Sequence, residues 1–267
     1  MNKIISNQNK YIKHAKSLHI KKYRDISGQY LIEGIKLMRE AYLNNIDLDM
    51  VFISSDIIED EGIRSIVDIC NKKCISVYET DNRIFKEISE TESSQGIIGI
   101  AKKVIYDLYD ILDNKVVNLI VLDEVQDPGN VGTIIRTADA CDFDGIILSK
   151  GCVDIYNSKT VRATMGSLFH LPIVTNIEIG ELMDTFEKEN VNTIGADAHE
   201  GIPCFDLKYK DKNALIIGNE SAGLSKIVMD RLDGKVNIPM SGRAESLNAA
   251  VAASILMYEI IRSKLKK

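Results

Sequence analysis

The stretch "VVNLIVLDEVQDPGNVGTIIRTADACDFDGIILSK" (residues 116–150) decides the fold, because it places a strand, a helix and a second strand in order. Residues 116–125 form a β-branched apolar run, which is typical of a strand buried on both faces of a parallel sheet. Residues 130–142 have the composition of a helix, and residues 145–150 are again a short apolar run. This order predicts parallel strands with helices covering the sheet.

The same alternation continues to the C-terminus. We expect strands at 191–199, 213–220 and 234–240, and helices at 180–190, 225–233 and 246–267. The segment 160–174 is expected to be helical, with an exit led by Pro172 into a further strand. Ligands of such sheets bind at the carboxyl ends of the strands, so the loops that follow the strands are the places to search for a site.

The first half of the chain shows a weaker version of this rhythm. Strands are expected at 49–56, 75–80 and 96–104, and helices at 29–42, 62–74 and 81–90. The sequence therefore predicts an α/β protein with a smaller N-terminal α/β domain (1–105), a linker (106–115) and a C-terminal domain (116–267) with a mostly parallel sheet.

Composition excludes several classes of protein. Hydrophobic residues make up 45% of the 267 residues and charged residues 27%, which is ordinary for a globular protein. No apolar run approaches the ~20 residues of a membrane span, and the polar, basic N-terminus has no apolar segment of a signal peptide. We therefore expect a cytoplasmic protein with no membrane partner.

The five cysteines are odd in number and scattered, which indicates reduced thiols rather than a disulfide framework. Cys70 and Cys74 are one helical turn apart, but no second pair of metal ligands lies nearby, so no metal site is expected.

The net charge of −6 is unevenly distributed. Residues 1–30 carry seven basic residues against one acidic residue, a local charge of +6 that leaves −12 for the rest. Such a segment suits a phosphate-contacting arm, and a solvated helix face that aids solubility is the alternative. The candidate RNA contacts are Lys10, Lys13, Lys16, Lys21, Lys22 and Arg24.

The first strand-end loop, "DEVQDPGNVGTIIRTADA" (123–140), carries two candidate residues. Asn130 stands at an expected helix start, where its structural role would be a cap worth ~1 kcal/mol. Arg136 lies among small and apolar residues and needs a partner, which is either an internal carboxylate or a phosphate.

The second loop, "IIGNESAGLS" (216–225), follows a β-branched strand that ends at Gly218. Its backbone groups can hold an adenine or a ribose. Glu220 would pair with Arg136 or orient a hydroxyl, and a carboxylate at a helix N-terminus is the structural alternative.

The third loop, "VNIPMSGRAESLNAAVAASI" (236–255), gives a strand, a turn and an Ala-rich helix. Ser246 is a candidate N-cap, and the free N–H groups after it form an anion site to which Ser246 and Asn248 would contribute. The flat alanine face of the helix allows a second helix to approach closely, in a dimer or in an ordinary core.

Taken together, "NVGTIIRTA" (130–138), "IIGNESAGLS" and "IPMSGRAESLNAAVAASI" (238–255) resemble the three signature motifs of the SpoU (TrmH) family of RNA 2′-O-ribose methyltransferases, in the SPOUT superfamily. The first half, through "YLIEGIKLMREAY" (30–42) and "SETESSQGIIGIA" (89–101), resembles the ribosomal-protein-like substrate-binding domain of that family. The resemblance implies a deep trefoil knot in the C-terminal domain, a homodimer formed through the knot region, and S-adenosyl-L-methionine as cofactor.

The resemblance also implies roles for particular residues. By resemblance Arg136 would activate the hydroxyl, but a guanidinium with a pKa above ~12 is a poor base, so binding the adjacent phosphate and stabilising the developing alkoxide fits its charge better. Asn130 would orient the ribose or Arg136. Glu220 would hold Arg136 or accept the proton, while Ser246 and Asn248 would fix the target phosphate or shape the cofactor loop. The cofactor-binding residues by motif are Gly218, Asn219, Ile238, Met240, Ser246 and Leu247.

The implied reaction is methyl transfer to a ribose 2′-hydroxyl of RNA, with 23S ribosomal RNA as the expected substrate and transfer RNA as the alternative. A catalytically silent RNA-binding or ribosome-assembly protein would be expected to lack the cofactor residues. A Rossmann-type oxidoreductase is disfavoured because G-x-G-x-x-G follows the first strand of neither half. Whether the modification serves ribosome maturation or antibiotic resistance, and which group is the general base, stay open.

Overall fold

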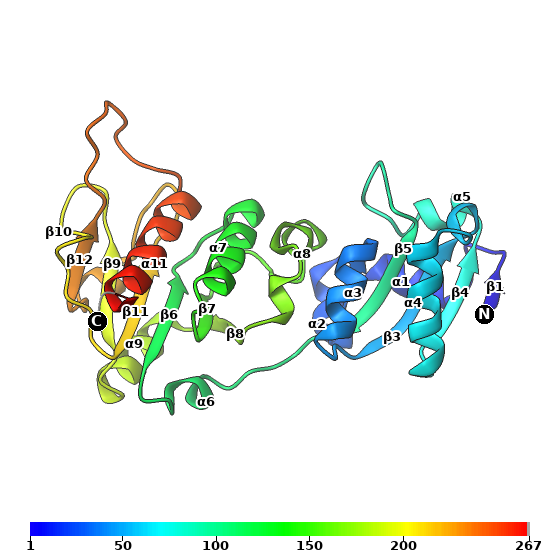
Figure 1. The fold of residues 1–267 in the computed structure, drawn as a ribbon, viewed down its shortest axis with the longest axis horizontal. Helices are drawn as coiled ribbons and strands as arrows, with labels where there is room; N and C mark the ends of the chain where they lie inside the picture. The colour runs from blue at the N-terminus through cyan, green and yellow to red at the C-terminus, as the bar shows by residue number, and fades with distance from the viewer. Residues whose placement is uncertain (266–267) are drawn as a thin grey trace. The chain divides into compact units, whose positions relative to one another are not determined.

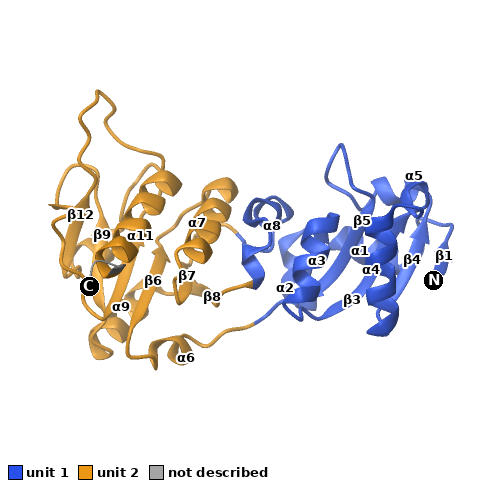
Figure 2. Ribbon diagram, viewed as in Figure 1, with its two compact units in different colours: residues 1–104, 154–169 blue, residues 105–153, 170–267 orange. Residues whose placement is uncertain are grey.

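The computed structural model describes residues 1–265 and divides into two compact units (Figure 2). Unit 1 comprises residues 1–104 and 154–169, and unit 2 comprises residues 105–153 and 170–267. Residues 154–169, which the sequence assigned to the C-terminal domain, thus belong to unit 1. Residues 106–115, expected to be a linker, contain a short helix whose Ile111 and Leu112 are buried in the core of unit 2.

Unit 2 is built on a seven-stranded sheet in the order β10-β12-β9-β11-β6-β7-β8, in which every pairing is parallel. Its strands are β6 (Val117–Leu122), β7 (Gly145–Ser149), β8 (Ile173–Ile177), β9 (Asn192–Ala196), β10 (Ile202–Pro203), β11 (Lys212–Ile217) and β12 (Gly234–Asn237). Strands β6 and β7 are buried along their whole length and apolar except for Asn118 and Ser149, as expected of strands covered on both faces. The predicted α/β fold with a mostly parallel sheet is confirmed, and the knot stays a prediction.

Five helices of unit 2 connect and cover these strands: α6 (Leu108–Leu112), α7 (Pro128–Ala140), α9 (Ile179–Lys188), α10 (Lys226–Met229) and α11 (Ala249–Leu265). Helices α7 and α11 lie side by side (Figure 1), and Thr137 and Ser254 share a 3.0 Å hydrogen bond between them. Leu182, Met183 and Phe186 of α9 pack into the core that the sheet also lines. The expected helix at 246–267 begins three residues later than predicted, and its residues 266–267 lie outside the described residues.

Unit 1 has a five-stranded sheet in the order β1-β4-β3-β5-β2, in which β5 is antiparallel to both of its neighbours. The strands are β1 (Asn2–Ile4), β2 (Gln29–Glu33), β3 (Leu48–Ser54), β4 (Ser76–Thr80) and β5 (Ile97–Lys102). The helices are α1 (Lys10–Ser17), α2 (Lys21–Ser27), α3 (Ile35–Leu43), α4 (Glu61–Lys72), α5 (Asn82–Lys86), α8 (Ser158–Thr164) and the 3-10 turns η1 (Ser55–Ile57) and η2 (Ser167–Phe169).

Two of the expected helices are wrong in extent. Residues 29–42 form strand β2 and helix α3, separated by Gly34, whose φ of +108° no helix can hold. The expected helix at 160–174 ends at Thr164, because Met165 and Gly166 adopt φ values of +54° and +108° and turn the chain. In both cases an apolar run at apparent helical spacing spans two elements.

The topology of unit 2 brings the three loops together. Strand β11 pairs with β6 on one side and β9 on the other, and β12 pairs with β9. Because all these strands run parallel, the loops that follow them leave the sheet at the same edge. This edge holds the candidate site.

Candidate active site

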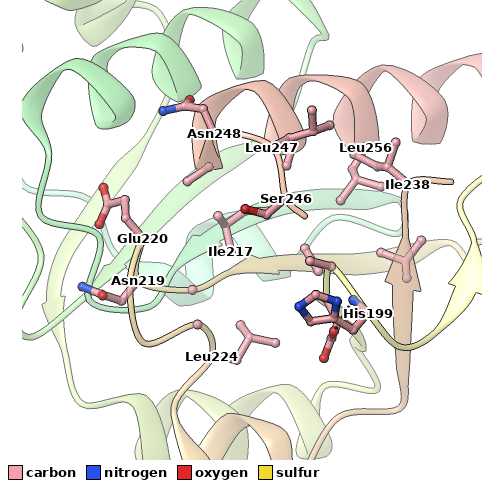
Figure 3. Close-up of a pocket in the computed structure, with 18 of the residues that line it drawn as sticks. His199, Ile217, Asn219, Glu220, Leu224, Ile238, Ser246, Leu247, Asn248 and Leu256 are labelled. Carbon is pink, nitrogen blue, oxygen red and sulfur yellow. Dashed lines mark hydrogen bonds between the residues drawn. The ribbon is translucent and has the colours of Figure 1, made fainter. Parts of the chain in front are cut away.

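A cavity of about 720 Å³ opens at this edge, between the loops that follow β9, β11 and β12 and the start of α11 (Figure 3). Its volume lies within the range of small-molecule and cofactor sites. All six residues that the motifs assigned to the cofactor line it: Gly218, Asn219, Ile238, Met240, Ser246 and Leu247. Three of the five candidate catalytic residues, Glu220, Ser246 and Asn248, line it as well.

Gly218 is required by the turn after β11. A Cβ atom at this position would lie 2.3 Å from the carbonyl carbon of Gly223, which is backbone and has no room to move. The turn is closed by two 2.9 Å hydrogen bonds between the backbones of Asn219 and Gly223. The side chain of Asn219 accepts from the N–H groups of Ser221 and Ala222, so the loop has a fixed shape without a ligand.

Three candidate residues form one chain of side-chain hydrogen bonds. Asn248 Nδ2 donates to Asn130 Oδ1 at 2.9 Å, and Asn130 Nδ2 donates to Glu220 Oε1 at 2.9 Å. Glu220 also accepts from the backbone N–H groups of Gln126 and Asp127, at 3.3 and 3.2 Å. The chain joins residues 90 and 118 positions apart and ties the first, second and third loops to one another.

The helix caps differ from those expected. Helix α7 is capped by Asp127, whose carboxylate accepts from Asn130 N–H at 2.8 Å, so Asn130 is not the cap. Helix α11 is capped by Asn248, whose Oδ1 accepts from the N–H groups of Ala250 and Val251, so Ser246 is not the cap. Because Asp127 takes the capping role, the side chain of Asn130 is free to bridge Glu220 and Asn248.

Glu220 is held ionised by its surroundings. Burial raises the pKa of its carboxyl, but the hydrogen bonds from Asn130 and from the backbone N–H groups of Asp127 and Gln126 outweigh this and leave the pKa below its ordinary value. A carboxylate with these donors is a positioning group that accepts protons poorly near neutral pH.

Arg136 lies about one and two-thirds turns after Asn130 on α7, and its side chain is exposed. Within residues 1–265 it forms no hydrogen bond and no ion pair. The expected pairing of Glu220 with Arg136 is therefore wrong, because Glu220 is occupied by Asn130 and by the α7 entry loop. Of the two partners considered for Arg136, the internal carboxylate is excluded within the described residues, and an external anion remains.

The cavity also contains polar residues that the motifs missed. Asp197 and His199 follow β9 and line the cavity, and His199 points into it in Figure 3. Burial raises the pKa of Asp197, yet hydrogen bonds from the N–H groups of His199 and Glu200 and the charge of Lys235 bring it below its ordinary value. The only signal in the sequence was their position at the end of an expected strand.

These surroundings fit S-adenosyl-L-methionine. Ile217, Leu224 and Val236, with Ile238 and Leu247, supply apolar walls on which an adenosine can lie. The carboxylates of Glu220 and Asp197 supply negative charge that complements the ammonium and sulfonium groups. Within the described residues, no group of histidine, cysteine and carboxylate side chains is arranged to hold a metal ion.

The basic N-terminal residues do not all behave as predicted. Lys10, Lys13, Lys16, Lys21 and Lys22 are exposed, and two of them are ion-paired, Lys16 with Glu87 and Lys21 with Asp25. Arg24 is a correction: it is buried, it donates to Asp154 Oδ2 at 2.7 and 3.0 Å, and it also donates to the carbonyls of Leu18 and His19. Its role is structural, and it has no surface left for RNA.

No helix in the part of the chain that the structure describes combines the length and apolarity that a membrane span needs.

Comparisons with known proteins agree with the geometry. Residues 118–258 match the SpoU rRNA Methylase family, and residues 9–99 match the MRM3-like substrate binding domain. The chain is 35% identical over 260 residues, 97% of this chain and 99% of the other, to the 23S rRNA (guanosine(2553)-2′-O)-methyltransferase RlmP of Bacillus subtilis. It is 40% identical over 151 residues, 55% of this chain and 53% of the other, to the 23S rRNA (uridine(2479)-2′-O)-methyltransferase of Streptomyces viridochromogenes.

Solved structures give the same result. The AdoMet-bound rRNA methyltransferase from Sinorhizobium meliloti matches with a TM-score of 0.85 and 30% identity, over 99% of this chain and 98% of the other. The SpoU methyltransferase AviRb from Streptomyces viridochromogenes, in complex with AdoMet, matches with a TM-score of 0.87 and 28% identity, over 97% and 99%. The chain belongs to the SpoU rRNA methylase family and is an RNA methyltransferase that uses S-adenosylmethionine.

Proposed function

We propose that this enzyme methylates a ribose 2′-hydroxyl of 23S ribosomal RNA, as the names of RlmP and of the S. viridochromogenes enzyme state for those relatives. The observation that carries the proposal is the convergence of the loops after β9, β11 and β12 on one cavity, two of whose lining residues, Glu220 and Asn248, are hydrogen-bonded to Asn130 of α7. The same helix carries Arg136, which has no partner among the described residues. The apolar walls fit an adenosine, and the exposed guanidinium fits an anionic polymer.

Bound S-adenosylmethionine supplies a methyl group already activated by its sulfonium. The chain has to hold the cofactor and place the hydroxyl in line with the methyl carbon. We assign the adenosine to the walls formed by Gly218, Ile238 and Leu247, with Met240 and Ser246 at the rim. Orientation of this kind supplies up to ~7–11 kcal/mol of the barrier in ideal cases.

The cofactor would supply its methyl group to the 2′-oxygen and leave as the neutral thioether, and the hydroxyl proton would pass to water. A guanidinium with a pKa above ~12 is a poor base, so we assign Arg136 to the neighbouring phosphate and to the alkoxide that develops on the 2′-oxygen. Glu220 positions Asn130, and Asn130 positions Asn248 at the start of α11. These three residues therefore shape the cofactor loop.

We further propose that the enzyme is a homodimer that associates through α11 and acts in the cytoplasm. Val251, Ile255 and Tyr258 lie on one face of this helix at i, i+4 and i+7, with 47%, 39% and 61% of their surface exposed. An apolar stripe of this kind suits a second copy of the same helix. Sedimentation should give a dimer for the native chain and a monomer for Val251→Glu/Tyr258→Glu.

The test of the reaction has two parts. Titration with S-adenosylmethionine in a calorimeter should give one site per chain at micromolar affinity. Incubation with cofactor labelled in the methyl group should then label 23S ribosomal RNA at one ribose and leave transfer RNA unlabelled. If only transfer RNA became labelled, the substrate would be transfer RNA and not 23S ribosomal RNA. If the cofactor bound but neither RNA became labelled, the result would favour a catalytically silent RNA-binding protein.

A further inference from the structure

Another cavity, of about 280 Å³, lies within unit 1 and shares no lining residue with the cofactor cavity. Its walls come from three segments: the β2–α3 junction, the loop before β5, and the end of α8. The first two contain "LIEG" (31–34) and "ETESSQG" (90–96), the parts of the N-terminal motifs for which the reaction has no role. The residues that matter are Gly34, Lys36, Thr91, Ser93, Arg162 and Met165.

The frame of this cavity is fixed by hydrogen bonds. Glu33 Oε1 accepts from the hydroxyls of Ser89, Thr91 and Ser94 at 2.5 to 2.6 Å. Gln95 Oε1 accepts from Ile35 N–H at 2.8 Å and closes the start of α3. One carboxylate oxygen of Glu33, which also lines the cavity, therefore holds the loop through three hydroxyl donors.

The two cations of the cavity have no such partners. The Nη1 atom of Arg162 is buried and unpaired among the described residues, and neither Arg162 nor the exposed Lys36 forms an ion pair there. Arg162 as a whole is only partly buried, and it lines the cavity together with Lys36, so two cations that have no ion-pair partner among the described residues border the same space. Arg24, a buried arginine of unit 1, shows the contrast, since each of its three side-chain nitrogens donates to an acceptor within the chain.

We propose that this cavity binds one nucleotide of the RNA substrate, with its backbone phosphate between Lys36 and Arg162. The phosphate oxygens would accept from the Arg162 guanidinium and from the Ser93 hydroxyl, since the Thr91 hydroxyl already donates its hydrogen to Glu33. Leu37, in the wall, and Met165, 44% exposed at the rim, supply apolar surface for the sugar or the base. The proposal rests on RNA being the substrate. It places the main RNA phosphate contact of unit 1 in this cavity and not at the lysines of α1 and α2.

The test compares the native chain with Lys36→Gln/Arg162→Gln in binding to a full-length 23S ribosomal RNA transcript at several salt concentrations. We expect the affinity to fall about tenfold, and the plot of log affinity against log salt to become shallower by about 1, as loss of one phosphate contact requires. In methylation, KM for the RNA should rise while kcat stays. Unchanged affinity and slope would overturn the proposal.

The matched control is Arg39→Gln, which removes one positive charge from the same helix α3 at an exposed position that does not line the cavity. It should retain native affinity and slope, and an equal loss would show that any charge on α3 suffices and would overturn the proposal. Inorganic phosphate at millimolar concentration should not compete with RNA in the native chain. Strong competition would assign the cavity to a free anion instead.

Two further readouts separate this proposal from the proposed function. Calorimetric affinity for S-adenosylmethionine should be the same in the native chain and the double variant, since the cofactor cavity is in unit 2. If the native chain binds 23S RNA without methylating it, and the double variant loses that binding, the cavity stands and the reaction fails. Thermal unfolding shows whether the double variant retains the native fold. If it unfolds at a lower temperature than the native chain, the single variant Lys36→Gln, which changes an exposed residue, replaces it in the binding test.

Discussion

Helix α7 contains two different kinds of functional residue within six positions. Asn130, in its first turn, is fixed at both ends of its amide by Glu220 and Asn248. Arg136, later in the same helix, is exposed and has no partner in the described chain. In the function proposed above, the cofactor side of the site would be preorganised by internal hydrogen bonds, whereas the RNA side would be completed by the substrate.

The sharpest test of this contrast is Arg136→Ala. Because Arg136 has no internal partner, we expect the unfolding temperature and the affinity for S-adenosylmethionine to stay within error of the native values. Methylation of 23S RNA should fall ~100-fold or more, as for loss of one transition-state donor. Single-turnover kinetics measures the methylation rate, and calorimetry measures the affinity for S-adenosylmethionine. An undiminished rate would show that Arg136 has no part in the chemistry.

The opposite pattern is expected for Asn130→Asp. The new carboxylate would face Glu220 across 2.9 Å, lose the hydrogen bond and add like-charge repulsion. We expect the unfolding free energy to fall by about 1–3 kcal/mol and cofactor affinity to fall about tenfold. Thr133→Asp adds the same charge to an exposed position of α7 and is the control. If both variants behave alike, the hydrogen-bond chain has no special role.

A smaller effect separates the two residues at the start of α11. Asn248→Ala removes the helix cap, so urea denaturation should show a loss of about 1 kcal/mol. Ser246→Ala should leave stability unchanged, because the hydroxyl caps nothing and lines the cofactor cavity. Equal losses in the two variants would restore Ser246 as a cap.

The smallest effect concerns pH. The pKa of Glu220 is lowered in the folded chain, so its ionisation stabilises the fold above the unfolded pKa of about 4.3, and this contribution is lost as pH falls through the lower folded value. Denaturation of the native chain and of Glu220→Gln, measured between about pH 3 and 6, should show a difference that narrows below about pH 4. A difference that is constant with pH would mean that Glu220 is not ionised in this role.

The sequence was sufficient for the parts of the molecule that depend on local pattern. The apolar strands of unit 2 predict the parallel sheet, and parallel strands place Gly218, Ile238 and the start of α11 at one edge. The caps were less predictable because Asp127, Asn130, Ser246 and Asn248 are all residue types that cap helices. Only the three-dimensional neighbours decide which of them does so.

Partners distant in sequence could not be predicted. Nothing near Arg24 indicates that Asp154, 130 residues later, neutralises it. Strand β2 was predicted as part of a helix, because the apolar residues of 29–42 have apparent helical spacing. In the structure Tyr30, Leu31 and Ile32 are buried and pair with β5, a contact that leaves no local signal in the sequence. The cavity of unit 1 proposed to bind a nucleotide could not be predicted for the same reason, since Arg162 comes from a segment predicted to belong to the other domain.

The assignment of residues 154–169 to unit 1 has a consequence for synthesis on the ribosome. Domains generally fold as units in order from the N-terminus, but unit 1 is incomplete when residue 104 emerges. The carboxylate for Arg24 arrives only after β6, α7 and β7 have been translated. Unit 1 can therefore complete its fold, with Arg24 paired to Asp154, only after the roughly fifty residues 105–153 of unit 2 have been synthesised.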